Sequence, residues 1–263
     1  MPANNKHIIQ IKNLVIGYQS KQQQTVVVSD IDLSIPKGSF VCILGKNGIG
    51  KSTLLRTITK VQPRLSGTIL IDKKPLESIS TSELAKKMSL VLTERIPDSN
   101  LTIYELIALG RQPYTNWIGK LQADDILKID WAIEQLHIKD VLNKRHDELS
   151  DGQLQKVMIA RALVQDTELI ILDEPTVHLD LHNTIEIFSI LKRLCLEHHK
   201  TIIISTHQIQ LALQLADNLC LLNTKGVLFG KTQTLIDNGS VANLFDSDLI
   251  KFDSKTKQFI HLL

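Results

Sequence analysis

Residues 45–53 carry the clearest chemistry in the chain; they are Gly45, Lys46, Asn47, Gly48, Ile49, Gly50, Lys51, Ser52 and Thr53. An apolar run over 40–44 precedes them and another begins at Leu54, which predicts a strand, a glycine-rich turn and a helix. In such a turn, successive backbone N–H groups point toward phosphate oxygens at the helix N-terminus. Lys51 can then reach the β- and γ-phosphates, and the Ser52 hydroxyl can hold Mg²⁺. The segment therefore predicts a nucleoside triphosphate site, with an ordinary glycine turn as the alternative.

Two adjacent carboxylates, Asp173 and Glu174, follow the apolar run 169–172. A continuous apolar run is typical of a parallel strand that is buried on both faces. Ligands of open α/β sheets bind at the carboxyl ends of strands, so we expect both acids to lie beside the phosphate loop. Because neighbouring strand residues point to opposite faces, we assign Asp173 to Mg²⁺ and Glu174 to the attacking water, as its base or polariser. A solvated strand end is the alternative.

A third segment, residues 149–164, begins with Leu-Ser-Asp-Gly-Gln and continues with helical spacing. Ser150 and Gln153 have the spacing of a capping box, so a helix is expected to begin here. Taken alone, the segment is equally well explained as a capped amphipathic helix. Tyr18, in the N-terminal part of the chain, is by itself an edge-strand aromatic. His207, which follows the apolar run 201–204, is by itself a capping or core histidine.

In this order, however, the segments resemble those of ATP-binding-cassette (ABC) ATPases. The usual signature of that family is L-S-G-G-Q, and the loop after its second acid resembles residues 175–180 here. The resemblance implies that Tyr18 stacks on adenine and that His207 contacts the γ-phosphate. It assigns catalysis to Lys51, Glu174 and His207. It assigns nucleotide binding, besides Tyr18 and residues 45–53, to Ser150, Asp151, Gly152, Gln153 and Asp180.

Two positions depart from the family pattern. Seven residues separate Thr93 from Leu101, and this spacing places Thr93 where the family has a glutamine that contacts Mg²⁺ and water. A shift of one residue places Glu94 there instead, and both stay open as metal contacts beside Ser52 and Asp173. Asp151 replaces a signature glycine. An acid in the first turn of a helix is favoured by about 0.3–1 kcal/mol, so we expect a structural role for Asp151 that leaves ATP binding intact.

Composition predicts a globular protein without nucleic-acid partners. The chain has 263 residues, 43% of them hydrophobic and 22% charged, as expected of a protein with a substantial core. A net charge of +2 and 4% aromatic residues do not resemble a nucleic-acid groove. The three cysteines, Cys42, Cys195 and Cys220, are scattered, which indicates a reducing compartment, and Cys42 is expected to be buried. Neither an export signal nor an apolar run of about 18 residues is visible.

The expected fold class is α/β. It has a P-loop NTPase core with a mainly parallel sheet and helices on both faces, an N-terminal antiparallel β subdomain and an inserted helical subdomain. Residues 8–18 and 26–35 are the expected antiparallel strands. Helix starts are expected at Ser80 and Thr102, and helical spacing runs over 123–136. The expected domains are an ABC ATP-binding domain over 5–240, which contains the helical subdomain at about 94–160, and a C-terminal extension over 241–263.

Residues 101–114 resemble a stretch found in the ATPase subunits of bacterial importers for iron-siderophores, haem and cobalamin. The resemblance implies a homodimer in which Ser150 of each chain faces Lys51 of the other, with ATP and Mg²⁺ as cofactors. It also implies transmembrane permease subunits, an extracytoplasmic substrate-binding protein, and a peripheral location on the cytoplasmic face of the bacterial inner membrane. The alternatives are a soluble ABC ATPase of another pathway, an importer of a different substrate, and a non-hydrolysing regulatory module.

Overall fold

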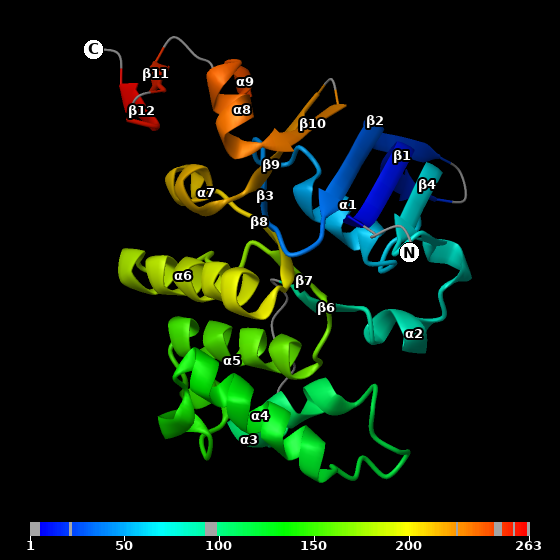
Figure 1. Cartoon of the computed structure of the whole chain (residues 1–263), viewed down its shortest axis with the longest axis vertical. Helices are drawn as coiled ribbons and strands as arrows, with labels where there is room; N and C mark the ends of the chain where they lie inside the picture. Colours follow the sequence, from blue (N-terminus) through cyan, green and yellow to red (C-terminus); the bar gives the residue numbers. More distant parts are fainter. Residues whose placement is uncertain are drawn as a thin grey trace. The chain divides into compact units, whose positions relative to one another are not determined.

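The computed structural model describes residues 6–20, 23–92, 99–224, 226–244, 249–254 and 256–261. The chain divides into two compact units. Unit 1 comprises Met1–Ile79 and Thr201–Leu263, and unit 2 comprises Ser80–Lys200. In Figure 1, unit 1 contains the blue and the orange-to-red segments, and unit 2 contains most of the green ones. The domain boundaries expected from the sequence stay predictions.

Unit 1 contains an antiparallel sheet with the strand order β2-β1-β4-β5. Its strands are β1 His7–Gln19, β2 Gln24–Pro36, β4 Ser66–Ile71 and β5 Lys74–Pro75. Along β1 the buried positions Ile9 and Ile11 are followed by Leu14 and Ile16, so the alternation changes phase. The pairing with β2 shifts register between Ile11 and Leu14, and Asn13 has a φ of 47°. A bulge at Asn13 thus keeps both halves of β1 facing the core.

The second sheet of unit 1 supports the phosphate loop. Its central strand β3 Phe40–Leu44 is parallel to β8 Thr201–Ser205 and to β9 Asn218–Asn223. All five residues of β3 and of β8 are buried, as the apolar runs predict. β10 Gly226–Lys231 pairs with β9 in the antiparallel sense. The remaining elements are α1 Lys51–Ile58, η1 Leu76–Ser78, α7 Ile209–Leu215, α8 Thr232–Asp237, α9 Ser240–Leu244 and a hairpin of β11 Ile250–Asp253 with β12 Gln258–His261.

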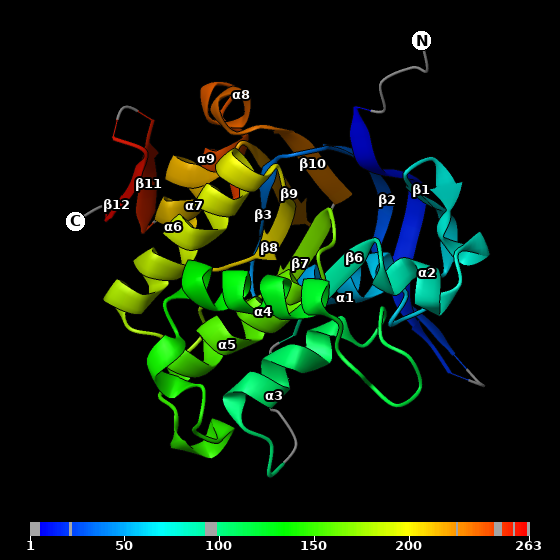
Figure 2. The same cartoon turned by 60° about the horizontal axis from the view of Figure 1, so that its bottom comes forward.

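Unit 2 contains the parallel pair β6 Met88–Val91 and β7 Leu169–Asp173. Its helices are α2 Thr81–Ala85, α3 Ile103–Ala108, α4 Ala123–Leu136, α5 Asp151–Val164 and α6 Leu181–His198, with short 3-10 turns η2 Leu109–Arg111, η3 Lys139–Val141 and η4 His146–Glu148. α5 contacts both α3 and α4, and these green helices lie together in Figure 2. The predicted helix over 123–136 is confirmed.

The stretch after α3 holds unit 2 together. At Gly110 an added Cβ would lie 2.2 Å from the carbonyl oxygen of Arg161, so only glycine allows this approach to α5. The next residue, Arg111, is 3% exposed. Its Nε donates to Oδ1 of Asp125 at 2.6 Å, and its guanidinium carbon lies 4.0 Å from the centre of the Tyr114 ring. The Gly-Arg-x-Pro-Tyr stretch therefore has a packing role within this unit.

Several local predictions are confirmed, and the tail holds more structure than predicted. The capping boxes of Thr102 and Ser150 are reciprocal, whereas the cap at Ser80 has one hydrogen bond, from the Glu83 N–H to the Ser80 hydroxyl at 3.2 Å. The C-terminal extension contains β11, and the helices α8 and α9 were not predicted. Cys42 is buried, as are the other two cysteines. Within the described ranges, no helix combines the length and apolar character needed to span a membrane.

Candidate nucleotide-binding site

The phosphate loop of unit 1 connects β3 to α1, as predicted. α1 begins at Lys51, and its N-cap Gly50 has a φ of 113°, a backbone conformation that a side chain would strain. The Leu54 N–H donates to the Gly50 carbonyl at 2.8 Å and closes the first turn of the helix. The first turn of α1 contains no acidic residue. Its N–H groups and the positive end of the helix dipole therefore favour an anion, as a phosphate site requires.

The structure brings two predicted catalytic residues together in unit 1. The Lys51 side chain is buried, and its ammonium lies 3.2 Å from the Gly45 carbonyl oxygen. It also lies 3.2 Å from Nε2 of His207, which follows β8. An ammonium has donors only, so His207 accepts this hydrogen bond with an unprotonated Nε2. These two contacts hold the Lys51 ammonium at the phosphate loop.

Tyr18 lies at the same end of α1. Its hydroxyl is 3.1 Å from Oγ1 of Thr53, in the first turn of that helix. The residue is 56% exposed, which leaves ring surface open for stacking. The position near the phosphate loop agrees with the adenine contact that the resemblance implies. The link to Thr53 was not part of that expectation.

Unit 2 holds the two predicted carboxylates at the end of β7. Asp173 is the last residue of the strand and is 2% exposed. Glu174 lies outside the strand and has a φ of 47°. The alternation argument for its direction therefore fails at this residue, because a left-handed backbone, not the strand, orients it. Such a conformation costs roughly 1–2 kcal/mol in a residue with a side chain, and strain of this kind is concentrated at functional sites.

The signature segment forms the start of α5. Oγ of Ser150 accepts from the Gln153 N–H at 3.3 Å, and Oε1 of Gln153 accepts from the Ser150 N–H at 3.2 Å. Asp151 is the first residue of the helix and is exposed. The position suits a carboxylate, since it lies at the positive end of the helix dipole. Asp180, the end of the loop after Glu174, forms the N-cap of α6.

The site residues are thus divided between the units. Unit 1 holds Tyr18, the phosphate loop and His207, and unit 2 holds the two acids, the signature segment and Asp180. Thr93 and Glu94 lie outside the described residues. Sequence reasoning missed Asn183, whose carboxamide contacts Asp180. Its position three residues after Asp180, the N-cap of α6, could have indicated a contact with that residue.

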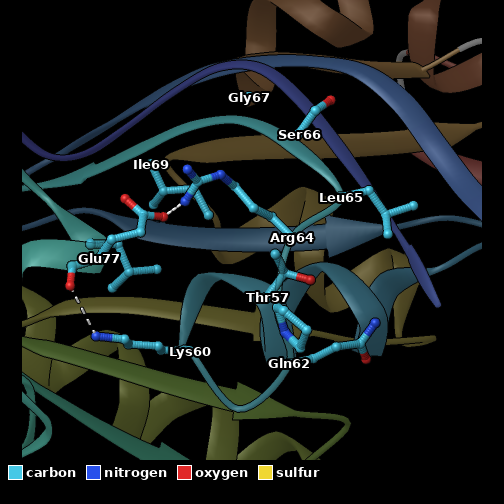
Figure 3. Close-up of a pocket in the computed structure, with 11 residues that line it drawn as sticks. Thr57, Lys60, Gln62, Arg64, Leu65, Ser66, Gly67, Ile69 and Glu77 are labelled. Carbon is cyan, nitrogen blue, oxygen red and sulfur yellow. Dashed lines mark hydrogen bonds and ion pairs between the residues drawn. The ribbon is translucent and has the colours of Figure 1, made fainter. Parts of the chain in front are cut away.

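One pocket of unit 1 is separate from the phosphate loop. Its volume is about 550 Å³, and it lies near the C-terminal end of α1, beside Thr57 and Lys60. Figure 3 shows Arg64 turned toward the carboxylate of Glu77, with which it forms an ion pair. Lys60 donates to the carbonyl oxygen of Ile79 at 2.7 Å. Because its cations are already engaged in this way, the pocket does not compete with residues 45–53 as the phosphate site.

Comparison with known proteins identifies the family of the chain. The sequence profile of the ABC transporter family matches residues 28–177, more than half of the chain. An uncharacterised ABC transporter ATP-binding protein of Methanocaldococcus jannaschii is 38% identical over 91% of this chain and 81% of its own length. The iron(3+)-hydroxamate import ATP-binding protein of Bacillus subtilis is 34% identical over 91% and 85%. The petrobactin import ATP-binding protein of Bacillus subtilis is 35% identical over 91% and 93%.

Solved structures show the same fold. A metal-chelate type ABC transporter in an inward-facing conformation matches with a TM-score of 0.78 and 24% identity over 97% of this chain and 96% of its own. A dimeric ATP-binding cassette with bound ADP and phosphate matches with a TM-score of 0.74 and 27% identity over 85% and 98%. The chain therefore belongs to the ABC transporter family, and it is a nucleotide-binding ATPase subunit of that family.

Proposed function

We propose that this chain hydrolyses ATP to power an importer of metal chelates of the iron-siderophore, haem or cobalamin type. The ATPase part is carried by the phosphate loop, with the buried Lys51 ammonium held between Gly45 and His207. The importer part is supported by the relatives named for hydroxamate and petrobactin import. We place the chain at the cytoplasmic face of the bacterial inner membrane, where it binds transmembrane permease subunits. An extracytoplasmic binding protein supplies those permease subunits with substrate.

In unit 1 the proposed roles follow from hydrogen-bond strength. The loop N–H groups of residues 45–53 bind the phosphates, and Lys51 exchanges its contacts with Gly45 and His207 for contacts with charged phosphate oxygens. With a phosphate oxygen both partners of the hydrogen bond carry charge, so an ion pair is added to the bond. His207 contacts the γ-phosphate. Tyr18 stacks on adenine, while its hydroxyl stays on Thr53 and limits the movement of the ring.

In unit 2 the proposed roles follow from the oxygen donors. Mg²⁺ prefers oxygen ligands, which Asp173 offers as a carboxylate and Ser52 of unit 1 offers as a hydroxyl; Thr93 or Glu94 is the further candidate contact. When bound, Mg²⁺ neutralises charge on the β- and γ-phosphate oxygens. Glu174 polarises or deprotonates the water that attacks the γ-phosphorus. The bond from that phosphorus to the bridging oxygen then breaks, and ADP and phosphate leave.

A homodimer completes the proposed site. A two-fold interface repeats each contact, so the signature segment of each copy can meet the phosphate loop of the other. A dimeric cassette among the similar structures supports this arrangement. The residues that would close on the partner's ATP are Ser150, Asp151, Gly152, Gln153 and Asp180.

The substitution Glu174→Gln tests the ATPase. It removes the general base while keeping the size of the side chain, so we expect kcat to fall by roughly 10²–10⁴. ATP binding persists, and the variant accumulates as an ATP-bound dimer in size-exclusion chromatography. The control Lys51→Ala loses ATP binding and remains monomeric. If Glu174→Gln hydrolyses ATP at the parental rate, Glu174 is not the general base.

Transport is tested separately, in vesicles that contain this chain and its co-purifying permease. We expect uptake of a radiolabelled ferric hydroxamate to require ATP and to stop in the Glu174→Gln variant. If the chain hydrolyses ATP but does not associate with membranes, the proposed ATPase activity stands and the proposed role in import is refuted.

A further inference from the structure

One side chain in unit 2 contacts both the loop after Glu174 and the start of the signature helix. The Asp180 carboxylate, N-cap of α6, receives three hydrogen bonds from Asn183. The backbone N–H of Asn183 donates to Oδ1 at 2.8 Å, and its side-chain Nδ2 lies 3.0 Å from Oδ1 and 3.0 Å from Oδ2. The backbone bond alone satisfies an N-cap. The carboxamide bonds are additional, and they fix the orientation of the carboxylate.

The other side of the same carboxamide faces α5. A Cβ added at Gly152 would lie 2.8 Å from Cγ and Oδ1 of Asn183 and 3.1 Å from Nδ2. The Asn183 side chain thus occupies the space in which a side chain at position 152 would lie. Asn183 cannot turn away without losing its bonds to Asp180. Gly152, Asn183 and Asp180 therefore form one continuous contact, named here the Asn183 contact.

The loop on the Asp180 side is itself ordered by backbone hydrogen bonds. The Val177 N–H donates to the Glu174 carbonyl at 3.2 Å, and the Leu179 N–H donates to the Thr176 carbonyl at 3.3 Å. Asp180 therefore ends a short, hydrogen-bonded segment that begins at Glu174.

We propose that Asn183 is a positioning residue of the ATPase, which holds the signature N-terminus and the Asp180 carboxylate in one fixed arrangement. The inference rests on the proposed function, in which both groups close on ATP bound to a second copy. Asn183 touches neither nucleotide nor water in this scheme. It acts through Gly152 and Asp180.

The chemistry of the contact sets which substitutions preserve it. Asn183→Ala keeps the backbone cap but removes the carboxamide, so we expect a native fold, an unchanged Kd of the monomer for Mg·ATP, and a kcat lower by about tenfold. Asn183→Ser keeps a short donor toward Asp180 and restores most of kcat. Asn183→Asp places a second carboxylate beside Asp180 and has a lower kcat than Asn183→Ala.

A double-mutant cycle tests the steric half of the contact. Gly152→Ala keeps the backbone N–H but adds a methyl group that collides with the carboxamide, so we expect a kcat lower by about tenfold or more. Removing the carboxamide makes room for that methyl group. The double variant Gly152→Ala/Asn183→Ala should therefore match Asn183→Ala alone rather than show the product of the two losses.

Steady-state ATPase assays, equilibrium ATP binding and thermal unfolding of all variants decide the outcome. A kcat of Asn183→Ala within twofold of the parent, or multiplicative losses in the double variant, overturns the positioning role. So does a drop in Tm accompanied by equal losses in kcat and ATP affinity, which marks a merely structural residue. If the parent itself neither hydrolyses ATP nor differs from Lys51→Ala, the proposed function fails and the positioning role fails with it. If the parent hydrolyses ATP but the Asn183 variants behave as the parent does, only the positioning role of Asn183 is refuted.

Discussion

Removing the carboxylate of Asp125 tests the packing of unit 2, because that group neutralises a buried guanidinium. The side chains of Arg111 and Asp125 are 4% and 5% exposed, and they meet at 2.6 Å. Breaking such a pair from one side costs roughly 3–5 kcal/mol, since the remaining charge stays buried. Arg111 keeps its bond to the Val164 carbonyl at 3.0 Å and its stacking on Tyr114. We therefore expect Asp125→Asn to lower the free energy of unfolding by about 3 kcal/mol, at the lower end of that range.

Urea unfolding followed by circular dichroism measures this loss, and the neighbouring acid supplies the matched control. Asp124 is on the same helix, but its side chain is 73% exposed. Its Oδ2 lies 3.5 Å from Nζ of Lys128. Asp124→Asn should change the free energy of unfolding by less than about 0.5 kcal/mol. If Asp125→Asn differs from this control by less than about 1 kcal/mol, the pair does not stabilise unit 2 in the way argued.

The same substitution has a signature in pH. Burial by itself raises the pKa of Asp125, but hydrogen bonds from the Gln122 N–H and from Arg111 outweigh it and hold the pKa below its ordinary value. A carboxyl whose pKa is lowered by folding stabilises the protein fully above its unfolded pKa, about 3.9. That contribution disappears as the pH falls through the lower, folded value. The parent should therefore lose more stability than Asp125→Asn below about pH 4.

Three further outcomes are expected. Gly110→Ala places a methyl group against the Arg161 carbonyl oxygen, so the free energy of unfolding measured in urea should fall by roughly 1–3 kcal/mol, and an unchanged value would contradict the close approach to α5. Burial raises the pKa of Cys220 to about 12, so the native protein should not react with a thiol reagent at pH 8 until urea exposes the thiol; rapid native labelling at this residue contradicts that burial. Tyr18→Phe keeps the ring and loses only the contact with Thr53, so its Kd for ATP should stay within about threefold of the parent, while Tyr18→Ala loses stacking worth roughly 1–3 kcal/mol. Equal affinities of these two variants in calorimetry would exclude stacking on Tyr18.

Patterns that depend on local sequence predicted the framework well. The strands β3, β7 and β8 were predicted because each is a continuous apolar run, which only burial on both faces explains. The bounds of α4 agree with the predicted range because helical spacing is sustained over fourteen residues. The helices α8 and α9, of six and five residues, were missed, since so short a segment shows little more than one period of a pattern.

Contacts between distant residues could not be predicted in the same way. The sequence shows Arg111 within a recognisable stretch, but it does not show that Asp125 is the partner, because many acids lie within reach of an arginine before the chain is folded. The contact of Asn183 with Gly152 joins residues thirty-one positions apart and depends on how α6 packs on α5. Even Glu174, predicted to be important, was given the wrong reason for its direction, since a φ of 47° follows from the turn and not from the strand.

The resting contact between Lys51 and His207 places a condition on the proposed chemistry. Nε2 of His207 accepts a hydrogen bond from the Lys51 ammonium at 3.2 Å, so it carries no hydrogen in this arrangement. A γ-phosphate oxygen is itself an acceptor, and Nε2 can bind it only as a donor. His207 must therefore present a hydrogen on the nitrogen that contacts the phosphate, so its contact with Lys51 has to be given up when Lys51 transfers to the phosphates. The two residues are coupled through one nitrogen atom, so their contributions to hydrolysis should not be additive in a double variant.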